Sequence, residues 1–317
     1  MSAARASAAR AASAARAGPV TPGPAANDVV TTGFFRARGR RMSKPAIVGL
    51  MLPFFSLLVF AFLYPLMSLI AISLTEPQPG LANYARVFEN PVYATVLLRT
   101  LRIALLVSLL SLILAFPVAA LMARSKGPKL ALITACILLP FWSSVLVRTA
   151  AWAVLLQRNG LVNGLLTGLG VTDAPVKLLY TQGAVVVAMT HVLMPFMVLP
   201  IYGALRNIPT DLARAAAICG AGPARAFREV TLPLALPGVT GGFILVFLSA
   251  LGYFITPSLL GSPQEMMIAT LISQQIRESL DWPFAAALVG VLTLFVTGIT
   301  LAFGRLFRFD RLMGARA

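Results

Sequence analysis

The stretch RNIPTDLARAAAICGAGPARAFREVTLPLALPGVTGG, residues 206–242, has the pattern of two short helices that lead into a long apolar helix. Pro209 suits the first turn of a helix, and Asp211 suits the positive N-terminal end of the same helix. Gly220 predicts where that helix ends, because glycine is favoured just past a helix C-terminus. Pro223 can then begin a second short helix.

The two short helices differ in the side chains that they carry. Small apolar residues recur on one face of the first helix, at Leu212, Ala215, Ala216 and Cys219. The second helix is charged and is expected to end before Pro233. A short helix with an alanine face can approach the backbone of another protein closely, as a docking element must. The alternative is a segment that lies on a membrane surface.

Six long apolar blocks make up most of the remaining chain and predict membrane-spanning helices. The 317 residues are 58% hydrophobic and only 11% charged, whereas a soluble domain carries roughly 25% charged residues. Each block approaches or exceeds the roughly 20 residues that a helix needs to cross the hydrocarbon core. Lipid offers no partner to a free backbone N–H, so we expect an all-α membrane protein. The blocks are residues 46–74, 95–123, 129–156, 183–204, 236–260 and 284–305.

The net charge of +16 is distributed as in a membrane protein. Basic residues gather before the first block, after the second block and at the end of the chain, while the alternate loops are balanced or acidic. This positive-inside pattern predicts a multi-pass protein of a bacterial inner membrane with both termini cytoplasmic. There is no basic face with interleaved aromatic residues, so nucleic acid is not an expected partner.

Three regions are expected along the chain. Residues 1–45 are rich in Ala, Arg, Pro and Gly, which predicts a disordered basic tail. This tail lacks the apolar core of a secretory signal peptide. Residues 46–305 form the transmembrane domain, whose segment 206–233 is cytoplasmic. Residues 306–317 form a second cytoplasmic tail.

The segment 206–233 resembles the coupling motif of ABC importer permeases, Glu-Ala-Ala, three residues, Gly, nine residues, Ile-x-Leu-Pro. The spacing is intact, with Val230 at the Ile position and Arg214 where the family has Glu. The segments 138–166, 174–205 and 281–288 are similar to the spermidine/putrescine-type branch of these permeases. By this resemblance the ATPase-coupling residues are Arg214, Ala215, Ala216, Gly220, Ala221, Val230, Leu232 and Pro233.

The resemblance implies a type I ABC importer permease (MetI-like) fold with six transmembrane helices. It also implies ABC ATPase subunits, a second permease subunit, a periplasmic solute-binding protein and membrane lipid as partners. The chain lacks the G-x-x-x-x-G-K-[ST] phosphate loop, so ATP hydrolysis would belong to a partner. The implied cargo is a small polar solute, with a polyamine such as spermidine or putrescine as the first candidate. A secondary transporter or channel that works without an ATPase is the rival interpretation.

Candidate residues of a substrate pathway lie within or beside the apolar blocks. They are Trp142, Ser143, Arg148, His191 and Tyr253. A charge inside a membrane is a functional candidate, but Arg148 could also extend to the interface. His191 could equally be a packing residue, and Trp142 an interface anchor.

The apolar blocks contain no Asp or Glu, which leaves the charge of the solute open. A polycation would cross without a carboxylate from this chain. No metal site, cofactor or catalytic residue is expected, because the chain has one His and only two Cys, Cys136 and Cys219, and no catalytic motif.

Overall fold

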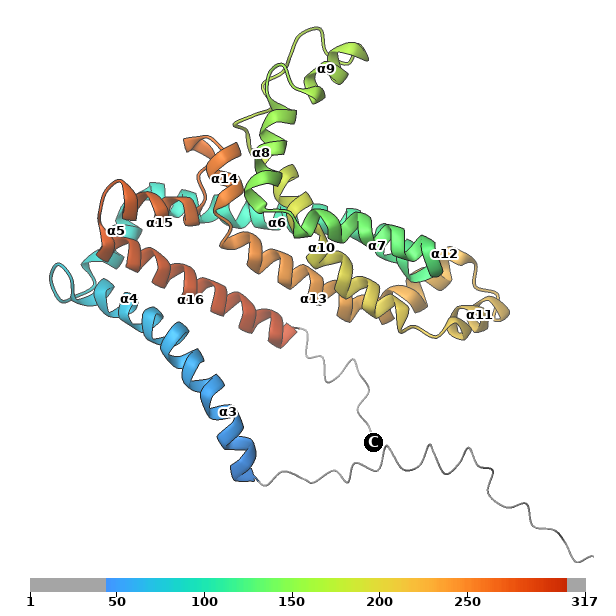
Figure 1. The fold of residues 1–317 in the computed structure, drawn as a ribbon, viewed down its shortest axis with the longest axis horizontal. Helices are drawn as coiled ribbons and strands as arrows, with labels where there is room; N and C mark the ends of the chain where they lie inside the picture. Colours follow the sequence, from blue (N-terminus) through green and yellow to red (C-terminus); the bar gives the residue numbers. More distant parts are fainter. Residues whose placement is uncertain (1–43, 307–317) are drawn as a thin grey trace, which may run out of the picture. The chain divides into compact units, whose positions relative to one another are not determined.

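The computed structural model describes residues 44–306, in which every regular element is a helix (Figure 1). The chain divides into two compact units, Met1–Leu63 and Tyr64–Ala317. The first unit contains α3 (Lys44–Leu58) and a π-helical turn, η1 (Val59–Leu63). The expected tails, residues 1–45 and 306–317, lie outside the described residues except for Lys44, Pro45 and Leu306.

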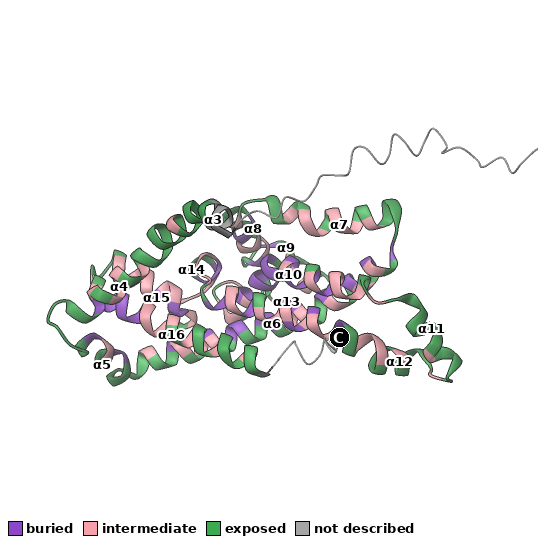
Figure 2. Ribbon diagram, turned by 90° about the horizontal axis from the view of Figure 1, so that it is seen from below, coloured by how far each residue is buried: buried purple, intermediate pink, exposed green. Residues whose placement is uncertain are grey.

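The second unit contains the remaining helices. They are α4 (Tyr64–Thr75), α5 (Ala82–Glu89), α6 (Pro91–Arg124), α7 (Gly127–Trp142), α8 (Val145–Leu156), α9 (Leu161–Gly168), α10 (Gln182–Arg206), α11 (Thr210–Ile218), α12 (Pro223–Ala226), the π-helical η2 (Phe227–Thr231), α13 (Leu232–Leu251), α14 (Ile255–Leu260), the 3-10 turn η3 (Pro263–Glu265), α15 (Ile268–Arg277) and α16 (Trp282–Leu306). Within this unit, α11 and α12 lie at one end and α5 and α15 at the other (Figures 1 and 2).

Three of the long helices begin at a side chain that accepts a hydrogen bond from a free backbone N–H. Asn90 accepts from Val92 N at 3.0 Å at the start of α6, and Thr181 accepts from Ala184 N at 3.3 Å at the start of α10. Asp281 Oδ1 accepts from Phe284 N at 3.1 Å at the start of α16. Such caps satisfy donors that have no partner inside the helix, and so they fix where each helix starts.

The helix α10 is the centre of the second unit, and both α6 and α13 pack against it. Figure 2 shows the buried residues concentrated on these helices. One face of α10 carries a stripe of apolar residues, four positions apart, that are fully or almost fully buried. They are Met189, Leu193, Met197 and Ile201. Because lipid is as apolar as these side chains, the contact is stabilised by close packing rather than by exclusion of water.

Two glycines of α13 allow the closest of these contacts. Gly238 and Gly242 are four residues apart, the small-xxx-small spacing that lets helix backbones approach. A Cβ atom at Gly238 would lie 2.5 Å from the Pro200 carbonyl oxygen and 2.5 Å from Ala204 Cβ. At Gly242 it would lie 3.1 Å from Met197 Sδ. The packing of α13 on α10 therefore depends on the absence of a side chain at Gly238.

The number of spans agrees with the six expected from the apolar blocks. Within residues 44–306, five helices are long and apolar enough to cross a membrane, and a bent pair makes a sixth if it is counted as one span. The five are Met51–Thr75, Pro91–Arg124, Gln182–Arg206, Pro223–Leu251 and Trp282–Arg305.

Two of the expected blocks are broken, and these boundaries were wrong. The block 129–156 divides into α7 and α8, and the segments Gly127–Trp142 and Val145–Gly168 meet at 98°. The break follows Pro140, whose carbonyl oxygen accepts hydrogen bonds from both Ser143 Oγ, at 2.6 Å, and the Ser143 N–H, at 3.2 Å, and these two bonds close the last turn of α7. The block 236–260 likewise ends as α13 at Leu251, and α14 is separate.

The expectation that the second short helix ends before Pro233 is also wrong. The helix runs without a break through α12, η2 and α13. Proline normally breaks a helix because it lacks an N–H and crowds the carbonyl four residues earlier. Here the wider π-helical turn of η2 ends two residues before Pro233, and η1 ends at the same distance before Pro65. These turns occur at the points where the helices continue past a proline.

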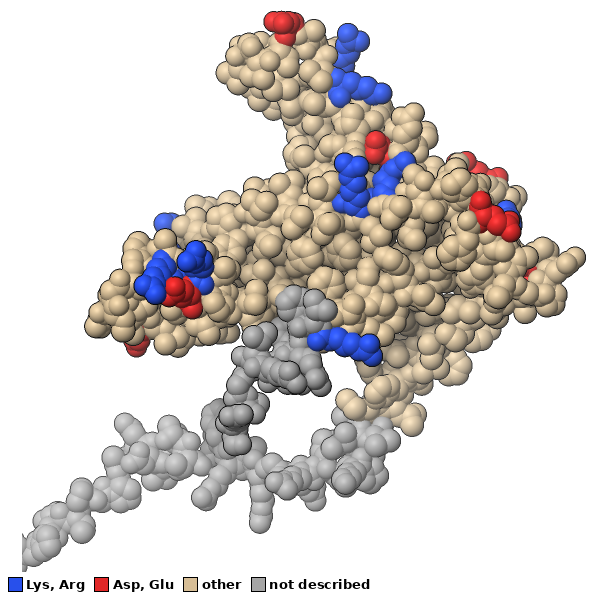
Figure 3. Space-filling model, turned by 180° about the vertical axis from the view of Figure 1, so that it is seen from behind, with Lys and Arg blue, Asp and Glu red and all other residues tan. Residues whose placement is uncertain are grey.

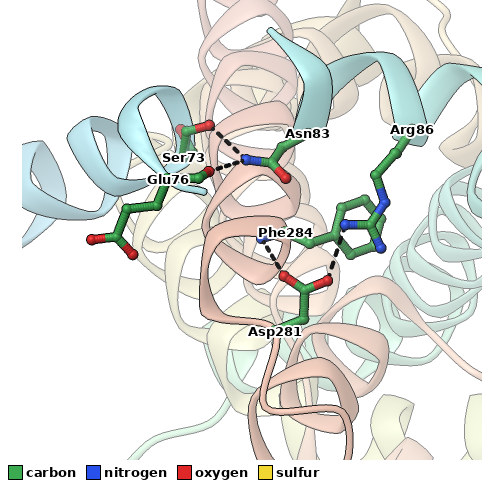
Figure 4. A network of polar contacts seen from close by, with 6 residues as sticks. All are labelled: Ser73, Glu76, Asn83, Arg86, Asp281 and Phe284. Atoms are coloured by element: carbon green, nitrogen blue, oxygen red, sulfur yellow. Dashed lines mark hydrogen bonds and ion pairs between the residues drawn. The ribbon is translucent and has the colours of Figure 1, made fainter. Parts of the chain in front are cut away.

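At the end with α5 and α15, a network of polar contacts joins α4, α5 and α16 (Figure 4). Asn83 Nδ2 donates to the carbonyl oxygens of Ser73, at 3.0 Å, and Glu76, at 2.8 Å. Arg86 forms an ion pair of 3.0 Å with Asp281, and its guanidinium carbon lies 4.2 Å from the centre of the Phe284 ring. Asp281 therefore both caps α16 and holds α5.

The two roles of Asp281 can be separated by substitution. Asp281→Ala removes the cap and the ion pair and is expected to cost about 1–2 kcal/mol. Asp281→Asn keeps a good cap and is expected to cost less than about 1 kcal/mol, because the ion pair is partly exposed. The apparent melting temperature of the purified protein in detergent checks this order. Equal losses for both variants would mean that the cap contributes nothing.

Candidate functional site

The helix α11, which carries the first half of the expected coupling motif, has no buried residue. Ala215 is exposed and Ala216 is half-buried, while Ile218 is 87% exposed. Figure 2 shows α11 almost entirely as exposed surface at its end of the second unit. A short apolar helix that its own chain leaves uncovered is available to another surface.

Gly220 ends α11 through a complete Schellman motif. Its N–H donates to Ala217 O at 3.0 Å, and the N–H of Ala221 donates to Ala216 O at 3.0 Å. Gly220 has a φ of +81°, a left-handed conformation that residues with a side chain rarely adopt. The backbone conformation therefore favours glycine at this position of the motif. An added Cβ atom would meet nothing within 4 Å in this chain.

The second half of the motif packs against the helices instead of projecting from them. Val230 and Leu232 are half-buried, although Pro233 is exposed. The Phe227 ring of η2 contacts the Phe116 ring of α6 edge to face, with centroids 5.6 Å apart. The motif thus has an exposed part, α11, and an anchored part, η2 with the start of α13.

The charges of this segment form two exposed local pairs. Arg214, at the position of the motif glutamate, lies 3.3 Å from Asp211, and Arg225 lies 3.0 Å from Glu229. Exposed pairs of this kind contribute about 0–1 kcal/mol, so they are easily exchanged for a partner's charges. On the face of the molecule drawn in Figure 3, the charged side chains lie in separate groups with broad uncharged surface between them.

A polar cluster lies where both broken spans meet α10. It consists of Arg148, Thr149 and Trp152 of α8, His191 of α10, Tyr253, and Thr256 of α14. The Thr149 and Thr256 hydroxyl groups are 3.2 Å apart and form a buried hydrogen bond. Trp152 Nε1 donates to His191 Nδ1 at 3.2 Å. Arg148 directly precedes Thr149, and Tyr253 lies three residues before Thr256, so the packing of α8 on α14 brings Arg148 and Tyr253 into the same region.

Two members of the polar cluster have polar atoms that are not satisfied. Arg148 is 9% exposed, and its Nε has no hydrogen-bond partner among the described residues. The buried Tyr253 hydroxyl makes no hydrogen bond of standard geometry in that part of the chain, although the Thr256 side chain lies close enough to interact with it. Buried polar atoms normally have partners, because leaving one unpaired costs about 1–3 kcal/mol and more for a charged group.

The structure brings together three of the five expected pathway residues, Arg148, His191 and Tyr253. Trp142 and Ser143 lie at the bend between α7 and α8, where the Ser143 hydroxyl donates to the Pro140 carbonyl oxygen. Trp142 is 81% exposed, as suits an interface anchor. Thr149 was not expected to take part. Nothing in the sequence distinguishes it, since its partner Thr256 is 107 residues away.

A cavity of about 390 Å³ lies beside α14 on the way to the α5–α15 end. Its lining is mixed, with Phe254 and Pro257 near the polar cluster and with Gln274, Arg277 and Glu278 on α15. A cavity with a few polar groups among apolar ones is typical of a site for a small polar molecule.

Comparison with known proteins reveals one family and several similar chains. The family described as "Binding-protein-dependent transport system inner membrane component" matches residues 115–309. The spermidine/putrescine transport system permease protein PotB of Salmonella typhimurium (strain SL1344) is 35% identical over 221 residues, which are 70% of this chain and 76% of PotB. The inner membrane ABC transporter permease protein YdcU of Escherichia coli (strain K12) is 36% identical over 250 residues, 74% of this chain and 79% of YdcU.

Among solved structures, the fold is similar to a chain of a bacterial alginate ABC transporter in complex with an alginate pentasaccharide-bound periplasmic protein. The TM-score is 0.66 at 20% sequence identity, over 83% of this chain and 94% of that chain. This likeness concerns the fold alone. The expected type I ABC importer permease fold is thereby confirmed.

Proposed function

Because the chain belongs to the family of binding-protein-dependent transport system inner membrane components, we propose that it is half of the membrane pathway of an ATP-driven importer. It is a multi-pass inner-membrane permease subunit, not an enzyme. A second permease subunit would supply the other half of the pathway. A periplasmic binding protein would deliver the solute to the α5–α15 end, which the charge pattern predicts to lie outside.

The observation that carries the proposal is the exposed α11 with its intact Schellman motif. In the proposed complex, α11 docks on an ATPase subunit through Arg214, Ala215, Ala216, Gly220 and Ala221. Val230, Leu232 and Pro233 lie within the continuous helix Pro223–Leu251, the fifth span, which follows the docked helix. When two ATPase subunits close on ATP, α11 moves with them. The attached span then shifts between outward-open and inward-open arrangements.

The proposed solute is a polyamine such as spermidine or putrescine. This finer proposal is supported by the similarity to chains named for spermidine and putrescine transport, at 31–35% identity. The polar cluster, including Arg148, His191 and Tyr253, would border the pathway. The binding protein would then supply most of the selectivity, since a pathway needs only weak and multiple contacts.

The test is a purification of the tagged full-length chain in mild detergent, expressed together with its neighbouring transport subunits. We expect an ATPase and a second permease to copurify. We also expect ATPase activity that rises severalfold when the binding protein is loaded with spermidine or putrescine. Stimulation only by a binding protein loaded with another solute would reject the polyamine proposal but support the proposal of an ATP-driven importer. Recovery of the chain alone, with transport driven by an ion gradient, would reject the importer in favour of a secondary transporter.

A further inference from the structure

Arg148 is a buried charge that has no counter-charge among residues 44–306. It is 91% buried, since 9% of its surface is exposed. None of the ion pairs between described residues includes it, and its Nε makes no hydrogen bond. A guanidinium stays charged at any physiological pH, so it cannot escape the cost of burial by losing its proton. An intramembrane charge is normally paired.

The spans described here do not contain the missing anion. No Asp or Glu occurs in α4, α6, α7, α8, α10, α13, α14 or α16. The described carboxylates lie in connecting segments or short helices, or in η2 at the α11–α12 end. The counter-charge must therefore come from outside this group of helices.

The exposed side of the polar cluster indicates where the anion enters. His191 is exposed at the middle of α10, an otherwise apolar span, and it is bonded to Trp152 next to Arg148. On α8, the neighbouring Val147 is 63% exposed and Val154 is 60% exposed. A polar imidazole is costly against lipid tails. This side is therefore expected to face protein.

We infer that Arg148 and the Tyr253 hydroxyl together form a carboxylate-binding site that an acidic side chain of the second permease subunit fills. The inference rests on the proposed function, which supplies that subunit. A carboxylate can accept hydrogen bonds from Nε and from the phenol at once, which gives the Arg148 Nε a partner and gives the phenol a charge-assisted one. The proposed solute is a cation and cannot provide this charge. The ion pair would hold the two permease subunits in register across the pathway.

The experiment uses zero-length cross-linking in the membrane-embedded complex. Arg148→Lys places a primary amine at the site, and a membrane-permeant carbodiimide activates nearby carboxyl groups. The amine attacks the activated carboxyl and an amide bond forms, while the carbodiimide leaves as its urea with the carboxyl oxygen. We expect a cross-linked heterodimer in the Arg148→Lys complex, and mass spectrometry then identifies the acidic residue.

Two controls make the cross-link specific. The wild type contains the same native lysines, and Arg148→Met has neither an amine nor a charge at the site. Neither the wild type nor Arg148→Met should give this adduct. Arg148→Met should also lower uptake by about tenfold or more while the complex still assembles. Exchanging the charges, with Arg148→Glu and an arginine at the identified position, should restore much of the uptake.

An assembled Arg148→Lys complex that gives no specific adduct with the second subunit would overturn the inference, and so would an Arg148→Met complex with normal uptake. The cross-link requires no solute. An adduct in a complex that does not take up polyamines would therefore reject only the proposed solute. If no second permease copurifies with the chain, the purification experiment has already rejected the proposed function on which this inference rests.

Discussion

Gly238→Ala is expected to lower the apparent melting temperature of the detergent-solubilised protein by several degrees. The added Cβ would lie 2.5 Å from the Pro200 carbonyl oxygen and 2.5 Å from Ala204 Cβ, both on α10. Neither atom belongs to a flexible side chain, so α13 has to move away from α10. Overpacking of this kind costs about 1–3 kcal/mol. For a protein of this size, that corresponds to roughly 2–4 °C per kcal/mol.

Gly241→Ala is the matched control on the same helix. A Cβ at Gly241 would meet nothing within 4 Å. Alanine is also favoured over glycine within a helix by about 1 kcal/mol, so this variant should be neutral or slightly more stable. Gly238→Ala should therefore lose stability in spite of its better helix propensity. Equal melting temperatures for the two variants would show that α10 and α13 are not packed this closely.

Gly220→Val should reduce solute uptake by about tenfold or more while the protein remains inserted in the membrane. At a φ of +81°, a residue with a Cβ costs roughly 1–2 kcal/mol, and a β-branched residue costs more. The end of α11 would then unwind, and the Schellman bonds from Gly220 and Ala221 would be lost. Uptake in membrane vesicles, together with the amount of inserted chain, measures the effect.

Gly220→Asn separates the backbone requirement from contact with a partner. Asparagine tolerates the left-handed conformation and should keep uptake within about threefold of the wild type. The chain itself leaves open space at this position. If the asparagine variant is as inactive as the valine variant, the added atoms collide with the docked ATPase. Normal uptake by the valine variant would refute the role of α11 in coupling.

The long helices could be predicted from the sequence because their length and composition leave no alternative in a membrane. Each apolar block approaches or exceeds the length that a helix needs to cross the hydrocarbon core. The caps Asn90, Thr181 and Asp281 were not predicted, and they start their helices a few residues before the expected blocks. Gly220 could also be predicted as the end of α11, because a left-handed residue after a helix is most often glycine.

The breaks in two of the apolar blocks, and the continuation of the helix past Pro233, could not be predicted in this way. The block containing Pro140 is apolar on both sides of the bend, so its composition gives no sign that the helix ends where the N–H and the hydroxyl of Ser143 both donate to the Pro140 carbonyl oxygen. At Pro233, the usual rule predicts a helix end, but the helix continues past this proline, with a π-helical turn just before it. The polar cluster depends on contacts between distant spans, such as Thr149 with Thr256. Patterns within one helix do not contain that information.

The unbroken helix from Pro223 to Leu251 fixes the scale of any motion that starts at α11. Its 29 residues form a rod about 40 Å long, at roughly 1.5 Å per residue. A tilt of about 10° around one end therefore displaces the other end by about 7 Å. If the continuous helix moves as one body, a few ångströms of movement at the α11–α12 end correspond to a few degrees of rotation along its whole length. The polar cluster at Tyr253 stands just beyond its far tip.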